Sequence, residues 1–243
     1  MKHLKTFICV LVLSAAFSCT KNHVDDCGHV SFSVANDPEV ELVTKSNVSD
    51  FTTLPQAGNF TITIKKEDGT SVYNGLLSAW DAATPLLIGK YTVEAVYGSV
   101  EEEGFDRPCF YGTKEFNVVG GETASVSVSV ALANTIIKVS CSDIFKKYYT
   151  DYSFKLTRDG ADVVTFTKDE TRAAFIDGYK IKVEGTLKSE NKTGSFSKEY
   201  TLLEEGKAYT LAFDVTNIGG STITISFNDE VVEEELGNLE LND

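Results

Sequence analysis

From residue 29 onward, apolar and polar residues alternate in short segments rich in valine, threonine and aromatic residues. Side chains two positions apart share one face of a strand, so this period is typical of half-buried antiparallel strands. No segment holds a sustained helical period, and we expect at most a short helical turn in residues 76–83 and 143–149. The clearest strand segments are residues 29–34, 60–65, 91–95 and 125–130. The pattern therefore predicts an all-β protein.

Turn signals separate these segments, and several segments recur later in the chain. Glycine-containing pairs mark the turns at Asp68-Gly69, Gly120-Gly121, Asp159-Gly160 and Gly219-Gly220. The matching segments are residues 60–69 with 152–160, 89–95 with 178–183, 114–118 with 198–202, 121–128 with 206–213, and 137–143 with 223–229. We predict two tandem antiparallel β-sandwich domains, immunoglobulin-like or transthyretin-like, at residues 28–133 and 134–243.

The N-terminus has the features of a secretory signal. A short basic start precedes an apolar run over residues 7–17, which is shorter than the about 20 residues of a membrane-spanning helix. Ser18 and Cys19 then resemble a bacterial lipobox. The resemblance implies a signal peptide at residues 1–18, lipidation of Cys19 and a polar tether over residues 19–27. The alternative is a plain secretory signal in which this cysteine stands by chance.

The charge balance narrows the range of partners. The chain has 243 residues, 36 acidic and 22 basic side chains, and a formal net charge of −14. Nucleic-acid binding needs clustered lysine and arginine, so we expect no nucleic acid. The same acidity argues against binding of the domains to anionic lipid. Three histidines, one tryptophan and one methionine leave little material for metal binding, and we expect no metal and no cofactor.

The cysteines give no sign of a metal site. No Cys-x-x-Cys spacing occurs, and no cysteine–histidine spacing suits zinc. Cys27, Cys109 and Cys141 remain after the signal and the lipidated residue are set aside, so at most one disulfide can form within the chain. Cys141 alternates with Val139, and we expect it to serve as a small buried hydrophobic residue.

Catalytic motifs are missing from the sequence, and we expect no enzyme activity. There is no Walker loop, no His-Glu-x-x-His and no Gly-x-Ser-x-Gly. Ser195 and Lys198 satisfy Ser-x-x-Lys, but they lie on a predicted strand with no helix behind it. Glu101–Glu103 and Asp106 could attract Ca²⁺, yet the spacing of an EF-hand loop is lacking.

Aromatic residues of the first predicted domain are the best candidates for recognition. The candidate ligand or partner contacts are Trp80, Tyr97, Phe105, Phe110 and Tyr111. Such side chains stack on sugar rings or fill a groove of a partner. The alternative is that Phe105 and Phe110, with Pro108, plug one open end of the sandwich. Trp80 is the best single choice for an exposed contact because small and polar residues flank it.

The C-terminal segment is acidic. Residues 229–243 hold seven acidic side chains and no basic one, and Leu239 and Leu241 still alternate. The segment predicts a last edge strand. This strand either completes its own domain, with acids protecting the edge, or pairs with a neighbouring subunit by β-augmentation.

Residues 87–118 carry a resemblance to a known family. They contain Gly-x-Tyr-x-Val-x-Ala at 89–95, a Phe-Asp-Arg-Pro-Cys-Phe-Tyr-Gly loop at 105–112 and Phe-Asn-Val at 116–118. This order resembles a domain-of-unknown-function family of Bacteroidetes surface lipoproteins, similar to the fimbrillin group of tandem β-sandwiches. Cys109 within the loop departs from the family pattern.

The resemblance implies structural or adhesive work at the cell surface. It implies a fimbrillin-like component or anchor, held in the outer membrane by its lipid and facing the cell exterior. Pilus subunits, host ligands or glycans would then be its partners. The alternative function is a glycan-binding surface lipoprotein associated with polysaccharide uptake.

Overall fold

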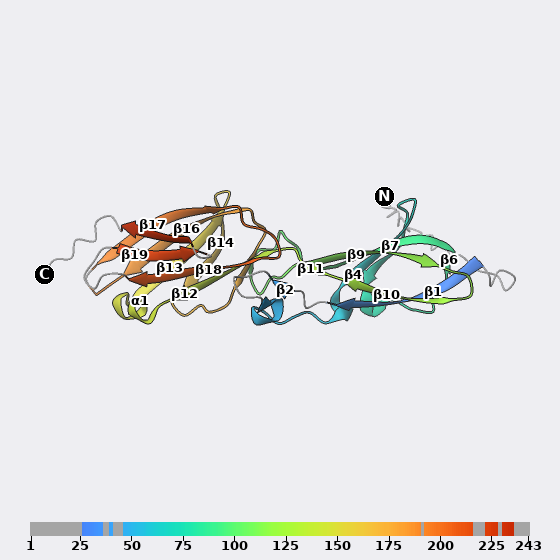
Figure 1. Ribbon diagram of the computed structural model, residues 1–243. Helices are drawn as coiled ribbons and strands as arrows, with labels where there is room; N and C mark the ends of the chain where they lie inside the picture. Colours follow the sequence, from blue (N-terminus) through green and yellow to red (C-terminus); the bar gives the residue numbers. More distant parts are fainter. Residues whose placement is uncertain are drawn as a thin grey trace, which may run out of the picture.

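The computed structural model describes residues 26–35, 39–40, 46–190, 192–215, 222–227 and 230–235. It shows two β-sandwiches arranged end to end, with the start of β1 at one end of the molecule and the β19–β20 hairpin in the other sandwich (Figure 1). The predicted all-β class and the sandwich architecture are confirmed. The signal peptide, Cys19 and Leu239–Leu241 lie outside the described residues.

The first sandwich packs a three-stranded sheet, in the order β10-β1-β6, against a five-stranded sheet, in the order β11-β9-β7-β4-β5. Its strands are β1 (Cys27–Ala35), β4 (Thr61–Lys66), β5 (Ser71–Leu76), β6 (Leu86–Leu87), β7 (Gly89–Tyr97), β9 (Phe110–Val118), β10 (Thr123–Ser129) and β11 (Ala131–Leu132). A separate two-stranded sheet joins β2 (Glu39–Val40) to β3 (Ser46–Asn47). Single helical turns lie at Val48–Asp50, Ala57–Asn59 and Leu77–Ala79.

The second sandwich packs a six-stranded sheet, in the order β20-β19-β18-β12-β15-β8, against a four-stranded sheet, in the order β14-β13-β16-β17. Its strands are β12 (Thr135–Cys141), β13 (Asp151–Arg158), β14 (Ala161–Thr167), β15 (Ala174–Ile176), β16 (Lys180–Lys188), β17 (Thr193–Thr201), β18 (Ala208–Val215), β19 (Thr222–Phe227) and β20 (Glu230–Glu235). The sixth strand, β8 (Gly104–Phe105), comes from the first half of the chain.

The internal repeat is visible in the strand pairing. β4, β7 and β9 neighbour one another in the first sandwich as β13, β16 and β17 do in the second. In each sandwich the opening strand pairs in parallel with a late strand, β1 with β10 and β12 with β18. These two parallel pairs were not predicted. The match of residues 137–143 with 223–229 is wrong, because β12 occupies the position of β1, whereas β19 pairs antiparallel with β18.

The helix α1 (Asp143–Tyr148) lies where a short turn was expected, directly after β12. The Ser142 side chain caps it by accepting a hydrogen bond from the backbone N–H of Phe145, 3.0 Å away. Phe145 is fully buried and anchors the helix on the second core. Within the described part of the chain, no helix is both long and apolar enough to cross a bilayer.

The two cores meet at the junction of the sandwiches. Ile136, Phe175 and Ala208 of the second half belong to the buried cluster of the first sandwich. In the opposite direction, Phe105 packs on the cluster of the second sandwich. The domain boundary between residues 133 and 134 stays a prediction. The structure shows that side chains from both sides of this boundary pack together.

Candidate functional site

β10 is one of the border strands of the first sandwich. Within the described residues, β10 is paired only with β1 and forms the border of its sheet. The sequence of β10 has no charged residue and no proline, the residues that usually protect an edge from pairing. Val126 and Val128 are buried, whereas the side chains of Thr123, Ser125, Ser127 and Ser129 are exposed. Among the residues that the structure describes, this edge therefore has strand backbone without a partner strand, between small hydroxyl side chains.

The equivalent edge of the second sandwich is occupied. β18 pairs in parallel with β12 on one side and antiparallel with β19 on the other. β19 continues into β20, which is the last strand of that sheet. The described strand β20 belongs to its own domain, whereas Leu239 and Leu241, on which the predicted last edge strand depends, lie outside the described residues, so both predicted alternatives stay open. The sequence of β20, EVVEEE, has four glutamates, and like charges along an edge disfavour a further strand.

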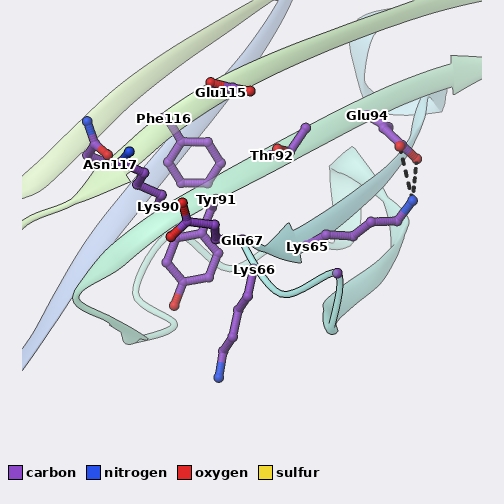
Figure 2. A pocket seen from close by; sticks show the side chains of 11 residues that line it. Lys65, Lys66, Glu67, Lys90, Tyr91, Thr92, Glu94, Glu115, Phe116 and Asn117 are labelled. Atoms are coloured by element: carbon purple, nitrogen blue, oxygen red, sulfur yellow. Dashed lines mark hydrogen bonds and ion pairs between the residues drawn. The ribbon is translucent and has the colours of Figure 1, made fainter.

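A second surface feature is an open depression of about 820 Å³ on the first sandwich. Figure 2 shows the side chains that line it, which come from β4, β7, β9 and the turn after β4. The strand register places Lys65 beside Thr92 and Thr92 beside Glu115. Hydroxyl, carboxylate, ammonium and amide groups therefore lie close together on a shallow surface.

One ion pair and one stacked pair of rings order this depression. The Lys65 Nζ donates to both carboxylate oxygens of Glu94, at 3.0 Å each (Figure 2). The rings of Tyr91 and Phe116 are stacked at 5.6 Å between centroids. The arrangement can hydrogen-bond a polar ligand. Among the described residues, no cluster of three or more histidine, cysteine or acidic side chains could hold a metal ion.

The structure corrects the expectation that Trp80 is exposed. Its indole is half-buried and lies edge-on to Phe32 and Tyr73, at 5.6 and 5.0 Å. The indole Nε1 donates to the backbone carbonyl of Val30 at 2.9 Å, so its polar group is already used. Phe32 comes from β1, far from Trp80 in the sequence, and Tyr73 comes from the preceding strand β5, so the residues next to Trp80 gave no sign of this packing. Its role as a ligand contact stays a prediction.

The other four predicted residues do not form one site. Phe110 is fully buried, and its ring lies near those of Phe60 and Tyr97. This packing fits the alternative in which Phe110 fills the sandwich. Tyr111 points to the other face of β9 and is 47% exposed. Phe105 lies in the second sandwich, edge-on to Phe166 at 5.0 Å.

A junction clamp holds the loop around β8 to the second sandwich. Arg158 Nε lies 3.1 Å from the Glu103 carboxylate, and that carboxylate also accepts the backbone N–H of Asp177 at 2.8 Å. Arg172 bridges Asp106 and Glu170 at 3.0 and 2.7 Å. We define the junction clamp as Glu103, Arg158 and Asp177 together with Asp106, Arg172 and Glu170. The contacts that tie the β8 loop to the second sandwich cannot be read from the sequence, because Arg158 lies 55 positions from Glu103 and Arg172 lies 66 positions from Asp106.

None of the three described cysteines, Cys27, Cys109 and Cys141, is part of a disulfide. Burial raises the pKa of the Cys141 thiol to about 11 and also raises the pKa of Cys109. Both stay protonated at neutral pH, and a protonated thiol is a poor nucleophile. Cys109 donates its backbone N–H to the side-chain oxygen of Asn134, a fully buried residue that opens the second half of the chain. Cys109 thus has a structural place at the junction.

Comparison with solved structures finds partial likeness to bacterial surface proteins. A candidate polysaccharide-binding protein from Bacteroides thetaiotaomicron is 11% identical at a TM-score of 0.45, over 89% of this chain and 100% of that one. A fimbrial assembly protein from Parabacteroides distasonis is 12% identical at 0.45, over 73% and 91%. The fimbrial anchor protein Mfa2 from Porphyromonas gingivalis is 11% identical at 0.40, over 84% and 98%. A search of curated proteins finds no match.

The sequence itself matches one family model over almost its whole length. The model is described as a domain of unknown function, DUF4493, and it spans residues 26–242. Both sandwiches of this chain lie inside the matched range. The resemblance to a family of unknown function that residues 87–118 carry is thereby confirmed. The chain belongs to the DUF4493 family.

Proposed function

We propose that this protein is a lipid-anchored component of the cell surface with a structural or adhesive role, a fimbrillin-like subunit or anchor. The lipobox-like Cys19 supports attachment to the outer membrane, with the sandwiches facing the cell exterior. Pilus subunits are the partner class that this role requires. No catalytic step belongs to the proposal, and a hydrolase activity lost on substitution of one carboxylate pair would contradict it.

The open edge of β10 is the observation that carries the proposal. The chain of the second sandwich fills the equivalent position with its own β19, antiparallel to β18. A strand from another subunit can add to β10 through main-chain hydrogen bonds in the same way. The exposed hydroxyl side chains of β10 place no charge in its path. β-Augmentation therefore gives a concrete mode of subunit contact.

Site-specific crosslinking in the producing cells tests this contact. A photoreactive side chain at Ser125 should crosslink to an extended segment of a secreted surface subunit, and Ser127→Lys should reduce that product several-fold. The matched control carries the photoreactive group at Ser195 and the substitution Ser197→Lys, on the exposed edge strand β17. Equal products from both edges, or none from β10, would contradict the proposed contact.

The depression in Figure 2 favours a second candidate function, a glycan-binding lipoprotein associated with polysaccharide uptake. Its ion pair, hydroxyl groups and Asn117 amide suit the many hydroxyls of a sugar chain. A glycan array separates the two functions. Specific binding that disappears in Lys65→Ala and Asn117→Ala would favour this candidate. Lys155→Ala, on the corresponding face of the second sandwich, is the control.

A further inference from the structure

The end of the first sandwich that holds Asp26 and Cys27, the first described residues, is built by three chain segments. The backbone N–H of Ile88 donates to the carbonyl of Asp26 at 2.9 Å, and the N–H of Gly121 donates to the carbonyl of Cys27 at 2.9 Å. The β6–β7 and β9–β10 connections therefore both lie against the start of β1. In Figure 1 this end is the one farthest from the second sandwich.

Three large aliphatic side chains are exposed on this end. Leu87 is 47% exposed, Ile88 53% and Val119 51%, and we call them the apolar tip. The antiparallel register of β7 and β9 pairs Gly89 with Val118. Ile88, just before Gly89, and Val119, just after Val118, therefore lie next to each other at the same end of these strands. Leu87 lies opposite Cys27 on β1. These positions bring the three side chains to one end of the sandwich.

The backbone holds the apolar tip in place. The Tyr91 hydroxyl donates to the carbonyl of Leu87 at 2.9 Å, and the ring of Tyr91 is itself buried. Gly89 and Gly121 have φ values of +148° and +72°, in a region that other residues rarely adopt. The exposure of these apolar side chains is therefore a property of the turn structure, and their grouping makes this end a candidate contact surface.

We propose that the apolar tip rests on the interfacial region of the lipid bilayer. The inference rests on the proposed lipid anchor at Cys19. Seven residue steps separate Cys19 from Asp26, and a fully extended chain covers about 3.3–3.6 Å per residue. The tip thus stays within about 25 Å of the membrane whenever the anchor is inserted. An apolar surface tethered so close to a bilayer meets lipid before it meets a free protein partner.

The charges around the tip select the kind of lipid. Lys66 and Lys90 lie beside it, and so does Glu67, whose backbone N–H donates to the carbonyl of Lys90 at 3.2 Å. The full set of charged neighbours is Asp26, Lys66, Glu67, Asp68, Lys90 and Glu122. Acids outnumber bases in this set, so anionic headgroups would be repelled. The contact therefore depends on the apolar side chains and is weakened where anionic headgroups are dense.

Such a contact would fix the orientation of the molecule relative to the membrane. With the apolar tip on the bilayer, the long axis of the two sandwiches points away from the membrane (Figure 1). The second sandwich then lies farthest out, and the edge of β10 lies along the side of the molecule. A partner strand could reach that edge without passing through lipid.

Quenching by brominated lipid tests the proposal on the full lipidated chain in phosphatidylcholine–phosphatidylethanolamine vesicles. The Ile88→Trp variant should lose about half of its added emission, because its side chain would sit in the interface. The matched control is Ile144→Trp on α1, a position that is 51% exposed in the second sandwich, and it should not be quenched. Adding Leu87→Ser and Val119→Ser to Ile88→Trp should remove most of the quenching.

The outcomes separate the tip from the anchor. Chains that float with the vesicles but show no quenching at position 88 overturn the tip contact and leave the anchor intact. Chains that do not float overturn the anchor and, with it, the tip contact. A blue shift of Ile88→Trp emission that grows with protein concentration in the absence of vesicles would assign the tip to a second copy of the chain, and would also overturn the proposal. Stronger quenching in phosphatidylglycerol-rich vesicles would contradict the expected repulsion between the acidic neighbours of the tip and anionic headgroups.

Discussion

The two sandwiches share the order of their central strands and differ in how one sheet ends. The small sheet of the first sandwich stops at β10, whose sequence is uncharged. The corresponding sheet of the second sandwich continues through β19 to β20, whose sequence has four glutamates. One repeat therefore closes its edge with its own chain, whereas the other has no second neighbour for that edge among the described residues. A duplicated fold has in this way acquired two different surfaces.

Their cores differ as well. The second sandwich contains an aromatic cluster in which the rings of Phe154 and Phe213 stack at 3.9 Å, next to Phe145. The centre of the first sandwich is mainly aliphatic, with Ile62, Ile64, Val93 and Val128 fully buried. The cluster of the first sandwich also includes side chains from the second half of the chain. We infer that the second sandwich supports the first.

The largest expected effect comes from breaking the aromatic cluster. Phe154→Ala removes a fully buried ring, and we expect it to lower the free energy of unfolding by about 3–5 kcal/mol. Urea denaturation can be followed by the single tryptophan, Trp80, which reports on the first sandwich. If the second sandwich supports the first, this remote substitution shifts the Trp80 transition too.

The control for that experiment is Tyr179→Ala, at a side chain that is 65% exposed. It should change the free energy of unfolding by no more than about 0.5 kcal/mol. A Trp80 transition that stays at its original urea concentration in Phe154→Ala would show that the two sandwiches unfold independently.

The junction clamp gives the next largest effect. Arg158→Ala leaves the Glu103 carboxylate, which is 12% exposed, without its cationic partner. We expect a loss of about 1–3 kcal/mol, since a poorly solvated charge is left unpaired. The Trp80 transition should then separate from the far-ultraviolet circular dichroism transition. Arg107→Ala breaks an exposed pair with Glu102 in the same loop, and its two transitions should still coincide.

The positions of the main strands and the presence of two repeats could be predicted from the sequence, because the alternation of apolar residues depends only on which face of a strand is buried. The sequence did not predict which strands pair. The parallel pairs β1–β10 and β12–β18 join segments far apart in the chain, and alternation contains no information about the neighbour. β8 has two residues, too few to show any period, yet it joins the sheet of the other sandwich.

The candidate site, too, could be predicted from the sequence only in part. The exposed serines of β10 can be read from residues 123–129, but the absence of a second neighbour for this strand in the described residues follows only from the pairing of all strands. For Trp80, sequence neighbours suggested exposure, whereas Phe32 and Tyr73 cover the ring in space. The apolar tip is readable as Leu87 and Ile88, but Val119 joins it only through the register of β7 and β9.

The smallest expected effect is on how the stability of the two sandwiches depends on pH. Hydrogen bonds from the Arg172 guanidinium lower the pKa of Glu170 to about 2, from an ordinary value of 4.5. A lowered pKa means that the ionised carboxylate stabilises the folded chain above its ordinary pKa, and that this contribution is lost as the pH falls through about 2. Glu170→Gln should therefore flatten the fall in stability between about pH 4.5 and 2, and cost less than about 1 kcal/mol at pH 7.

Because Arg172 also holds Asp106 of the β8 loop, acid should separate the two unfolding transitions in the unsubstituted chain. Asp162→Asn breaks a pair within the second sandwich and should leave that separation unchanged, so an equal effect of both substitutions would mean that the clamp does not join the sandwiches.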